Sequence, residues 1–598
     1  MPEYLAPGVY VEETSFRAPS IEGVGTSTAA FVGPTLTGPV PRPPTEPDPN
    51  PPEVLTSFGD FAARYGGYEN LKLTNDPTDP QNINHLALSV KAFFDNGGSR
   101  LYVSRVFTGK GGNDLGLATS GTAGDDKVAL VARFQGSALN DRPVAVTLIA
   151  AKTQTLSNLP PGSLLVDPAK DPNDATKLKP VYYINGAGGD FAKSDDPNTK
   201  LKADALPQGL SLITVSVALP SASGNTSVFE GLGLDSNHPQ YIGKILGATP
   251  PRRIDQLENQ VAFVIGKNVT AAKLFAEFFG TEVGKTAPAD WPKVQAKIYT
   301  LGNGNDGTVP ASADYETALH TLEALENVAI VAAPGSSAFA SGAAVINSLI
   351  THVERQRAYR VAVLDTKANA LASEVEDVRA KIDSSYSALY TPWVIVPNPI
   401  ARPGTADSTE IAVPPSGFIA GIYARNDVQH SVAKAPANEV VLGALRFERN
   451  INFAEQGVLN PLGINCLRFF PGRGYRVWGA RTASSNSEIK YVNVRRYLVY
   501  LEHSIDNGTQ WAVFENNGPL LWARVKESVE EFLHNELKEG NLFGTSDAEA
   551  YFVRCDRSTM TQNDRDNGRL ICLIGVALLK PAEFVIFRIG QKTADARS

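Results

Sequence analysis

Between residues 312 and 397 the sequence alternates regularly between helix-like and strand-like segments, and this alternation limits the fold more than any other feature. Apolar residues recur at helical spacing in ADYETALHTLEALEN and AAVINSLITHVERQ, whereas VAIVAAPG, RVAVLD and TPWVIVP are short apolar runs typical of buried strands. A sheet with helices packed across it accommodates both patterns. The same helix-then-strand order, NHLALSVKAFFDNGG followed by LYVSRV, appears near the N-terminus. We therefore expect an α/β core assembled from two parts of the chain.

Residues 108–254 have a different texture. Gly, Ser, Thr, Asp and Asn dominate, and strand-like runs such as PVAVTLIA and SLITVSVAL are separated by turn residues without a helical period. This pattern predicts an inserted all-β domain, either a small sandwich or a barrel. A further segment, residues 39–52, holds eight prolines in fourteen positions and predicts a stiff, solvated loop.

At 598 residues the chain is too long for a single hydrophobic core. The predicted fold class is α/β and α+β, with several domains. The expected division is an N-terminal strand arm (1–25), the first part of the α/β domain (26–107), the β insertion (108–254), the second part of the α/β domain (255–440), a C-terminal domain (441–580), and a C-terminal strand arm with a polar tail (581–598).

Charge and composition exclude several classes of function. The net charge of −8 argues against extensive nucleic-acid binding, which needs a basic face. The longest apolar run, 570–579, is far below the roughly 20 residues that span a bilayer, so no direct membrane insertion is expected. The three cysteines have no CxxC spacing and are interpreted as buried thiols in a reducing compartment. With no secretory signal at the start, we expect a chain that is made and assembled in the bacterial cytoplasm.

Strand-like segments stand at both ends of the chain. Near the start, Pro7 and Gly8 precede Val9, Tyr10, Val11 and Glu12, which favour an extended backbone. A lone strand gains little until its backbone groups pair with another sheet, inside the same chain or in a different molecule. Near the other end, successive residues alternate as a strand with two distinct faces should: Phe584, Val585, Ile586, Phe587, Arg588 and Ile589.

One long amphipathic helix is predicted close to the C-terminus. In LLWARVKESVEEFLHNELKEG the apolar residues fall on one stripe, the charged residues face away, and Gly540 ends the helix. The stripe is expected to serve internal packing.

Three short motifs suggest enzyme chemistry but fit poorly. Gly302, Gly304 and Gly307 form GxGxxG after a strand, yet Thr308-Val309-Pro310 stands where a dinucleotide site needs its helix to begin. FGTEVGKT is one residue too short between its glycines for a phosphate loop. NGNDG lacks the carboxylates of a calcium loop. We expect no catalytic, cofactor or metal site, and no cofactor.

A string of segments in the C-terminal half resembles the contractile tail sheath family, which is shared by contractile-tailed phages, R-type bacteriocins and phage-like contractile injection systems. These segments, in order, are LDTK, SSYSALYTPWVIVPNP, VPPSGFIAGIYARND, VAKAPANE, LNPLGINCLRFFPGRGYRVWGARTAS, YVNVRRYLVYLEHSI and KPAEFVIFRIGQ. PGVYVEE, FFDNGG…YVSRV and LGNGNDG…DYETALHTLE also fit. The likeness covers about residues 1–107 and 255–592 and leaves out the proline-rich loop and the β insertion.

The resemblance implies a structural subunit that polymerises helically around an inner tube and contracts from a metastable extended state to drive the tube through a target envelope. Its partners would be copies of itself, the inner tube protein, and baseplate and terminal cap proteins. Both arms would add strands to a small sheet in a neighbour's C-terminal domain, which would be the inner domain of the sheath. Gly23 and Gly25 are the hinge candidates of the N-terminal arm, and Lys526, Glu530 and Lys538 are the candidates for tube contact.

Two other functions stay open at this point. The GxGxxG motif leaves a dinucleotide-binding oligomeric enzyme as one alternative. The other is a non-contractile shell protein, which would form one lattice state instead of two.

Overall fold

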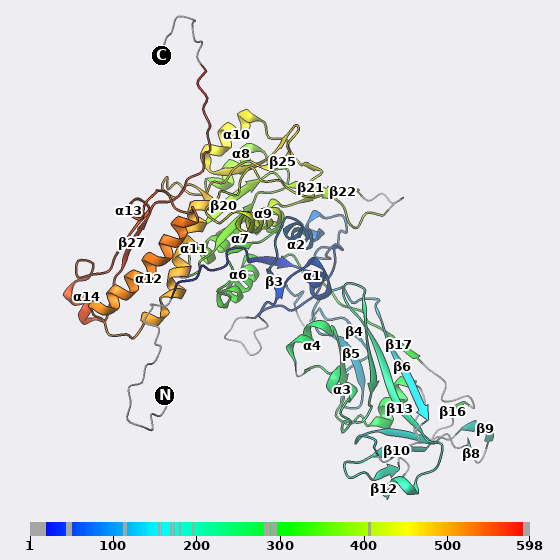
Figure 1. The fold of residues 1–598 in the computed structure, drawn as a ribbon. Coiled ribbons are helices and arrows are strands. Elements are labelled where there is room, and N and C mark those ends of the chain that lie inside the picture. Colours follow the sequence, from blue (N-terminus) through cyan, green and yellow to red (C-terminus); the bar gives the residue numbers. More distant parts are fainter. Residues whose placement is uncertain are drawn as a thin grey trace, which may run out of the picture.

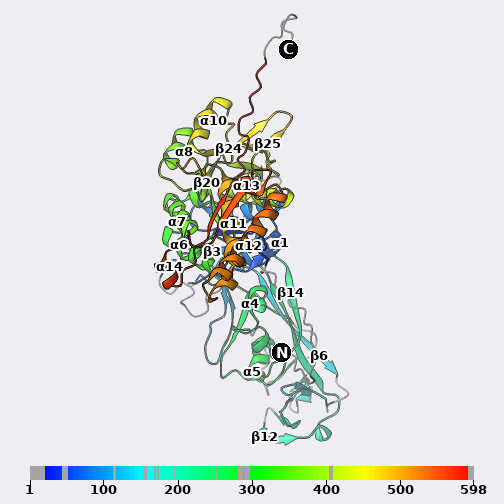
Figure 2. The ribbon, with the colours of Figure 1, turned by 60° about the vertical axis from the view of Figure 1, so that its left-hand side comes forward.

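The computed structural model describes residues 20–42, 51–111, 116–152, 158–167, 181–193, 196–250, 252–279, 296–402 and 408–589, together with 156, 170–171, 174–178, 287–288 and 404. Figure 1 shows three parts: an α/β core, a β-rich lobe that extends from one side of it, and a helical C-terminal domain against the other side. The lobe points away from the core in Figure 2 as well.

The core is built on an eight-stranded sheet whose strand order is β2-β3-β1-β18-β19-β20-β24-β25. The strands from β3 to β24 are parallel to their neighbours, whereas the edge strands β2 and β25 are antiparallel. Parallel strands covered on both faces favour apolar runs, and the predicted runs VAIVAAPG and RVAVLD form two of these strands. The run TPWVIVP was predicted to join them but forms Val394–Pro397 of a separate antiparallel sheet, and Ser387–Thr391 takes its place in the core. The strands are β1 (Ala29–Pro34), β2 (Val54–Leu55), β3 (Leu101–Val106), β18 (Ile330–Ala332), β19 (Val361–Asp365), β20 (Ser387–Thr391), β24 (Ile464–Phe470) and β25 (Gly474–Val477).

Helices cover both faces of this sheet, so that side chains alternate between two hydrophobic clusters. In β1, Ala29 and Phe31 enter one cluster and Ala30 and Val32 enter the other. The first face carries α1 (Phe58–Tyr65), α2 (His85–Asp95) and α9 (Pro415–Gln429). The second carries α6 (Ser312–Thr321), α7 (Gly342–Glu354), α8 (Ala372–Arg379) and α10 (Phe453–Leu459).

The lobe corresponds to the predicted insertion but extends past residue 254. Strand β15 (Val261–Ile265) pairs with β5 (Val128–Ala132), and β17 (Ala296–Thr300) pairs with β6 (Pro143–Lys152), so its sheets continue to residue 300. It also contains helices, and α5 (Ala271–Phe279) packs into its core, so the expectation of an all-β insertion needs correction. The remaining elements are β4 (Thr119–Ser120), β7 (Leu164–Asp167), β8 (Lys170–Asp171), β9 (Asp174–Leu178), β10 (Val181–Asn185), β11 (Phe191–Lys193), β12 (Asp196–Leu201), β13 (Ser211–Pro220), β14 (Thr226–Leu232), β16 (Ala287–Pro288), α3 (Ile242–Ile245) and α4 (Arg253–Glu258).

The C-terminal domain packs the helices α11 (Val492–Gly508) and α12 (Pro519–Lys538) against a two-stranded sheet of β26 (Tyr551–Arg554) and β27 (Leu573–Val576). The predicted amphipathic helix is α12, and its apolar stripe is buried as expected. After its end, Gly540 adopts a positive φ of 77°, which suits glycine. Because β24 and β25 belong to the central sheet, the α/β core continues past residue 440, where the sequence predicted it to end.

A small antiparallel sheet lies beside the core, and short helices complete the fold. These elements are β21 (Val394–Pro397), β22 (Glu410–Val413), β23 (Arg446–Phe447), α13 (Asp547–Ala550) and α14 (Gln562–Asp566). Among the helices that the structure describes, none combines the length and the apolar character that a bilayer crossing requires.

Candidate assembly site: the two arm roots and the C-terminal hairpin

The chain enters the body of the protein through residues 21–26, here called the N-terminal root. Ile21 is buried in the core of the C-terminal domain, and the Val24 amide donates a hydrogen bond of 3.1 Å to Ser504 Oγ on α11. Gly23 lies so close to Tyr500 that an added Cβ would stand 2.1 Å from the Tyr500 hydroxyl oxygen. The N-terminal root is therefore packed, and the predicted arm of residues 1–25 ends before Ile21.

A buried ion pair fixes the last part of the N-terminal root. Arg496 donates to both carboxylate oxygens of Asp427, at 2.8 and 2.6 Å, and the two side chains are only 3% and 4% exposed. Arg496 also donates to the Thr26 carbonyl at 3.1 Å, while the Thr26 hydroxyl donates to Asp427 at 2.6 Å. Burial lowers the pKa of Arg496, but the Asp427 carboxylate outweighs it, so the pKa lies above its usual range. The N-terminal root is thus tied to α9 and α11 together.

The chain leaves the body at Glu583, which with its partners is here called the C-terminal root. The Glu583 carboxylate accepts hydrogen bonds from Arg481 at 2.8 and 2.6 Å, from Asn460 at 2.7 Å and from Tyr491 at 2.9 Å. Lys490 adds a weaker ion pair at 3.7 Å. Burial raises the pKa of Glu583, and the hydrogen bonds from these partners lower it further than burial raises it, so the net shift is downward. The carboxylate is therefore held in its charged form.

Beyond Glu583 the described chain, here called the C-terminal arm (584–589), projects from the body (Figure 1). It contains the predicted strand residues, all exposed, from Val585 at 70% to Ile589 at 96%. Within the described residues this segment makes no strand pairing. The counterpart at the other end, residues Val9, Tyr10, Val11 and Glu12, lies outside the described part of the chain. The described residues after Glu583 therefore form an exposed, mostly apolar segment.

The β26–β27 hairpin forms a small sheet of the C-terminal domain. It has two strands, with Tyr551 opposite Val576 and Arg554 opposite Leu573. Its inner face packs on α12 through residues such as Val553, which is buried, whereas Phe552 is 53% exposed. A two-stranded sheet leaves unpaired backbone groups along its edges, which is the geometry that strand addition needs.

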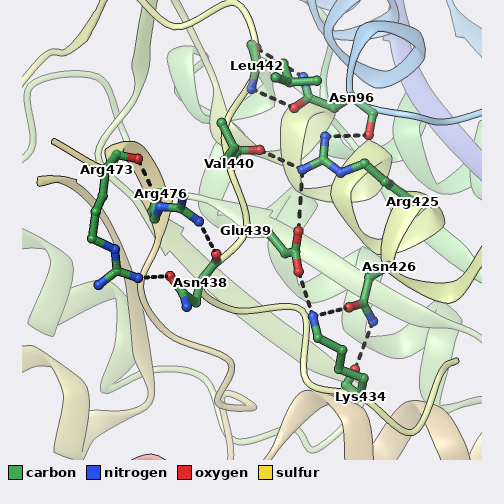
Figure 3. Close-up of polar contacts among 10 residues, drawn as sticks. All are labelled: Asn96, Arg425, Asn426, Lys434, Asn438, Glu439, Val440, Leu442, Arg473 and Arg476. Atoms are coloured by element: carbon green, nitrogen blue, oxygen red, sulfur yellow. Dashed lines mark hydrogen bonds and ion pairs between the residues drawn. The ribbon is translucent and has the colours of Figure 1, made fainter. Parts of the chain in front are cut away.

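The loop between α9 and β23 links the core to the C-terminal domain, and polar contacts hold its shape (Figure 3). Lys434 binds Glu439 at 2.6 Å, and Arg425 donates to the carbonyls of Asn96, at 3.1 Å, and Val440, at 2.6 Å. At the far end, Arg476 donates to the Asn438 carbonyl at 2.6 Å. Figure 3 shows these contacts as two groups, one around Arg425, Glu439 and Lys434 and the other joining Asn438 to Arg473 and Arg476. The contacts give the loop a fixed path between the two parts.

The same loop reaches both roots. Its Val432 and Ala433 pack in the cluster that contains Ile21, and Asn493 on α11 donates to the carbonyls of Ala433, at 2.7 Å, and Leu579, at 3.1 Å. The N-terminal root and the segment that leads to the C-terminal root therefore share one rigid support.

The predicted tube-contact residues lie on the outer side of α12. Lys526 and Glu530 are partly exposed and form an ion pair of 3.6 Å, and Lys538 is exposed at the end of the helix. Glu536, on the same helix, is buried and accepts hydrogen bonds of 2.8 Å from both Tyr497 and Tyr500. The charged residues of α12 therefore lie in two places. Glu536 anchors the helix inside the domain, whereas Lys526, Glu530 and Lys538 lie on its surface.

The GxGxxG segment forms the return from the lobe to the core. Gly304 exchanges hydrogen bonds with the Asn140 side chain, at 2.9 and 2.8 Å. The Asp306 carboxylate accepts from the backbone amides of Lys72, at 2.9 Å, and Ser137, at 2.7 Å. The next helix, α6, begins at Ser312, outside the glycine motif. The glycine segment therefore serves as an internally hydrogen-bonded turn between the lobe and the core.

Sequence reasoning missed the residues that make the two roots: Asp427, Arg496, Arg481 and Glu583. One signal was available, because NVRRYLVYL places two arginines inside an otherwise apolar helical run. An arginine at such a position is buried only when it is paired. The partner could not be read from the sequence, since Arg496 and Asp427 are 69 residues apart.

Comparison with known proteins identifies the family of this chain. The family model described as the phage tail sheath protein central domain matches residues 309–483, and that described as the phage tail sheath C-terminal domain matches residues 484–592. The chain belongs to the tail sheath family. The boundary between the two matches falls just after the central sheet ends, which agrees with the correction at residue 440.

One curated relative agrees with this membership, and two solved structures are similar to the chain. The tail sheath protein of Vibrio phage KVP40 is 25% identical over 188 residues, which are 31% of this chain and 27% of that protein, so the match spans about a quarter of its length. A chain in the baseplate structure of the anti-feeding prophage (AFP) is 30% identical over 47% of this chain and 73% of that chain, with a TM-score of 0.41. The sheath complex of an extracellular contractile injection system, PVC, in its contracted state covers 99% of both chains, with 18% identity and a TM-score of 0.51. At that identity the last match shows a shared fold.

Proposed function

We propose that this chain is the subunit of a contractile sheath. Copies polymerise helically around an inner tube in an extended, metastable state and contract to drive the tube through a target envelope. The observation that carries the proposal, beside family membership, is an exposed apolar segment that leaves the body from an anchored root, in a chain that also carries a two-stranded hairpin. The partners are other copies of the chain, the inner tube protein, and baseplate and terminal cap proteins, and assembly takes place in the bacterial cytoplasm.

The arms join subunits by strand addition. Residues 584–589, and the N-terminal strand around Val9–Glu12, pair with the edges of the β26–β27 hairpin in neighbouring subunits. Backbone hydrogen bonds supply affinity in this mode of binding, and the alternating side chains supply specificity. The roots support this role, because an arm that carries load between subunits needs a fixed point on its own body.

The C-terminal domain forms the inner layer of the sheath, and the lobe lies outside, where it does not obstruct the tube. The tube then meets the exposed face of α12, with Lys526, Glu530 and Lys538 in contact. Exchanging both lysines for glutamate should weaken assembly on the tube and spare sheath that polymerises without it. Lys244→Glu in α3 of the lobe is the matched control, since it removes one exposed lysine elsewhere. If all variants assemble equally well on the tube, the exposed face of α12 is solvated and does not contact the tube.

Contraction needs no nucleotide, because its free energy is the difference between two packings of the same chain. The contracted packing buries more surface between subunits, and contact with the tube stabilises the extended one, since only a differential interaction holds a less stable state. The arm strands stay paired in both states, and the bodies turn as near-rigid units about the segments next to the roots.

Truncation tests the arms directly. Removing residues 1–19 or 584–598 should leave a folded protein that forms no tubules, since Ile21 and Glu583 remain in place. Removing only residues 593–598 is the control and should leave assembly unchanged. Circular dichroism reports folding and electron microscopy reports tubules; normal tubules from either arm truncation would contradict strand addition.

Two alternatives make different predictions. A non-contractile shell would show one lattice state. It would be favoured if density maps of the two forms showed identical packing between subunits. A dinucleotide-binding oligomer would bind nucleotide in solution and form small assemblies in place of sedimentable tubules. The Asn140 and Asp306 contacts at the glycine loop weigh against that alternative, and we propose a structural, non-enzymatic role without a cofactor.

A further inference from the structure

Two of the three cysteines face each other at one end of the C-terminal hairpin. Because Arg554 lies opposite Leu573, continuing the same antiparallel register by one residue places Cys555 opposite Cys572. Both cysteines are free.

The hydrogen-bond pattern of the hairpin fixes the type of this pair. The Ala577 amide donates to the Ala550 carbonyl at 2.7 Å, so Ala550 and Ala577 are a hydrogen-bonded pair of this ladder. Such pairs alternate with non-hydrogen-bonded pairs along an antiparallel ladder, and five steps along, Cys555 and Cys572 fall on a non-hydrogen-bonded position. Cα atoms of such pairs are about 4.5 Å apart, with the side chains close together. A disulfide bridges Cα separations from about 4.4 to 6.8 Å.

The surroundings of the pair favour a reaction between its two thiols. Cys555 is buried against Leu521, Trp522 and Val525 of α12, whereas Cys572 is partly exposed and can be reached by a small molecule. The third cysteine, Cys466, is buried in the central sheet, where desolvation raises its pKa to about 12.

We propose that Cys555 and Cys572 form a cross-link site, which closes to an intrachain disulfide when the protein leaves a reducing compartment and so locks the β26–β27 hairpin. The oxidant is a low-molecular-weight disulfide such as oxidised glutathione. The Cys572 thiolate attacks one of its sulfurs and releases one thiolate, giving a mixed disulfide. The Cys555 thiolate then attacks the Cys572 sulfur and releases the second. Both released thiolates take up protons, so one disulfide is exchanged for another and two small thiols form.

The benefit of such a bond follows from the size of the hairpin. Two paired strands alone are marginally stable, and a covalent bond between them restricts their separation. The disulfide proposal rests on these contacts within one chain and not on sheath assembly. Its test can therefore fail while the proposed sheath function stands, and the sheath function can fail while the disulfide proposal stands.

The test exposes the full-length reduced protein, under native conditions, to oxidised glutathione and then counts free thiols after denaturation. The count should fall from three to one, and peptide mapping without reduction should recover Cys555 linked to Cys572. Cys466→Ser should lose both of its remaining thiols, whereas Cys555→Ser and Cys572→Ser should form no intrachain bond. Hydrogen exchange of the hairpin amides should slow at least ten-fold in the oxidised protein.

Several outcomes would overturn the proposal. They are three persistent thiols, a stable glutathione adduct on Cys572, disulfides between chains, or a linked peptide that contains Cys466. If the bond forms but the hairpin amides exchange at the reduced rate, the site is a cross-link without a locking effect, which overturns the second half of the inference. The wild-type measurement needs no variant, so poor folding of a serine variant does not obscure the result.

Discussion

The two roots hold their arms by different physical means. At the N-terminal root, an isoleucine is buried, a glycine lies against a tyrosine ring, and an ion pair with 3% and 4% exposure is enclosed between α9 and α11. At the C-terminal root, a single carboxylate at the rim of the body collects several donors. A buried ion pair that loses one partner leaves an uncompensated charge. A partly solvated carboxylate that loses one partner can instead form hydrogen bonds with water. We infer that the loss of one partner costs more stability at the N-terminal root than at the C-terminal root.

This difference also bears on where the bodies turn during contraction. Gly23 and Gly25 were expected to provide the N-terminal hinge because glycine adopts many conformations. Gly23 instead permits close approach to Tyr500. The position of the hinge stays a proposal.

The largest expected effect comes from exchanging the arginine of each root for methionine. Arg496→Met leaves Asp427 buried without its cation and should lower the free energy of unfolding by about 3–5 kcal/mol. Arg481→Met leaves Glu583 with Asn460, Tyr491 and Lys490 and should cost about 1.5 kcal/mol. Urea unfolding followed by tryptophan fluorescence compares the two variants. Equal losses would remove the distinction between the roots.

The next effect separates packing from hinge motion at the N-terminal root. Gly23→Ala should cost about 1–3 kcal/mol, because its Cβ would overlap the Tyr500 hydroxyl, which Glu536 holds in place. Gly25→Ala meets nothing within 4 Å and should change stability by less than about 0.5 kcal/mol. Thermal unfolding measures both variants. If the two glycines act as hinges, both variants should instead keep wild-type stability and slow contraction.

A smaller and local effect is expected at the C-terminal root. Glu583→Gln removes the negative charge that faces Arg481 but keeps the side-chain shape, so global stability should change little. Backbone amides at residues 579–583 should exchange about five-fold faster, which corresponds to about 1 kcal/mol. Hydrogen exchange with mass spectrometry detects this, and residues 21–26 serve as the internal reference. Unchanged exchange at 579–583 would mean that Glu583 does not hold the root.

The smallest effect is a pH dependence confined to the same root. Because the pKa of Glu583 is lowered in the folded protein, its stabilising contribution is complete above the ordinary glutamate pKa of about 4.3 and is lost as pH falls through the lower folded value. Protection at residues 579–583 should therefore be constant from pH 8 to pH 5 and decline only in stronger acid. The Glu583→Gln variant should lack this decline. A loss of protection already near pH 6 would contradict the direction of the shift.

Local patterns in the sequence determined much of the fold. The apolar runs of the core strands, the period of α2 and α7, and the stripe of α12 each follow from the spacing of a few neighbouring residues. Local hydrogen-bonding chemistry also determines one helix start, because the Ser57 side chain, at the N-cap of α1, accepts from the Asp60 amide at 3.1 Å. Such features need no information from distant parts of the chain.

Tertiary structure alone decided which elements belong together. The segments that form β15, β17 and β24 are all short strand-like runs in the sequence. The first two nevertheless belong to the lobe, and the third belongs to the core. A strand's pattern records that one or both of its faces are buried, but not against which partner. The roots depend on the same long-range information. Arg481 and Glu583 are 102 residues apart and Thr26 and Asp427 are 401 apart, so only the packed fold brings their charges and hydrogen-bonding groups together.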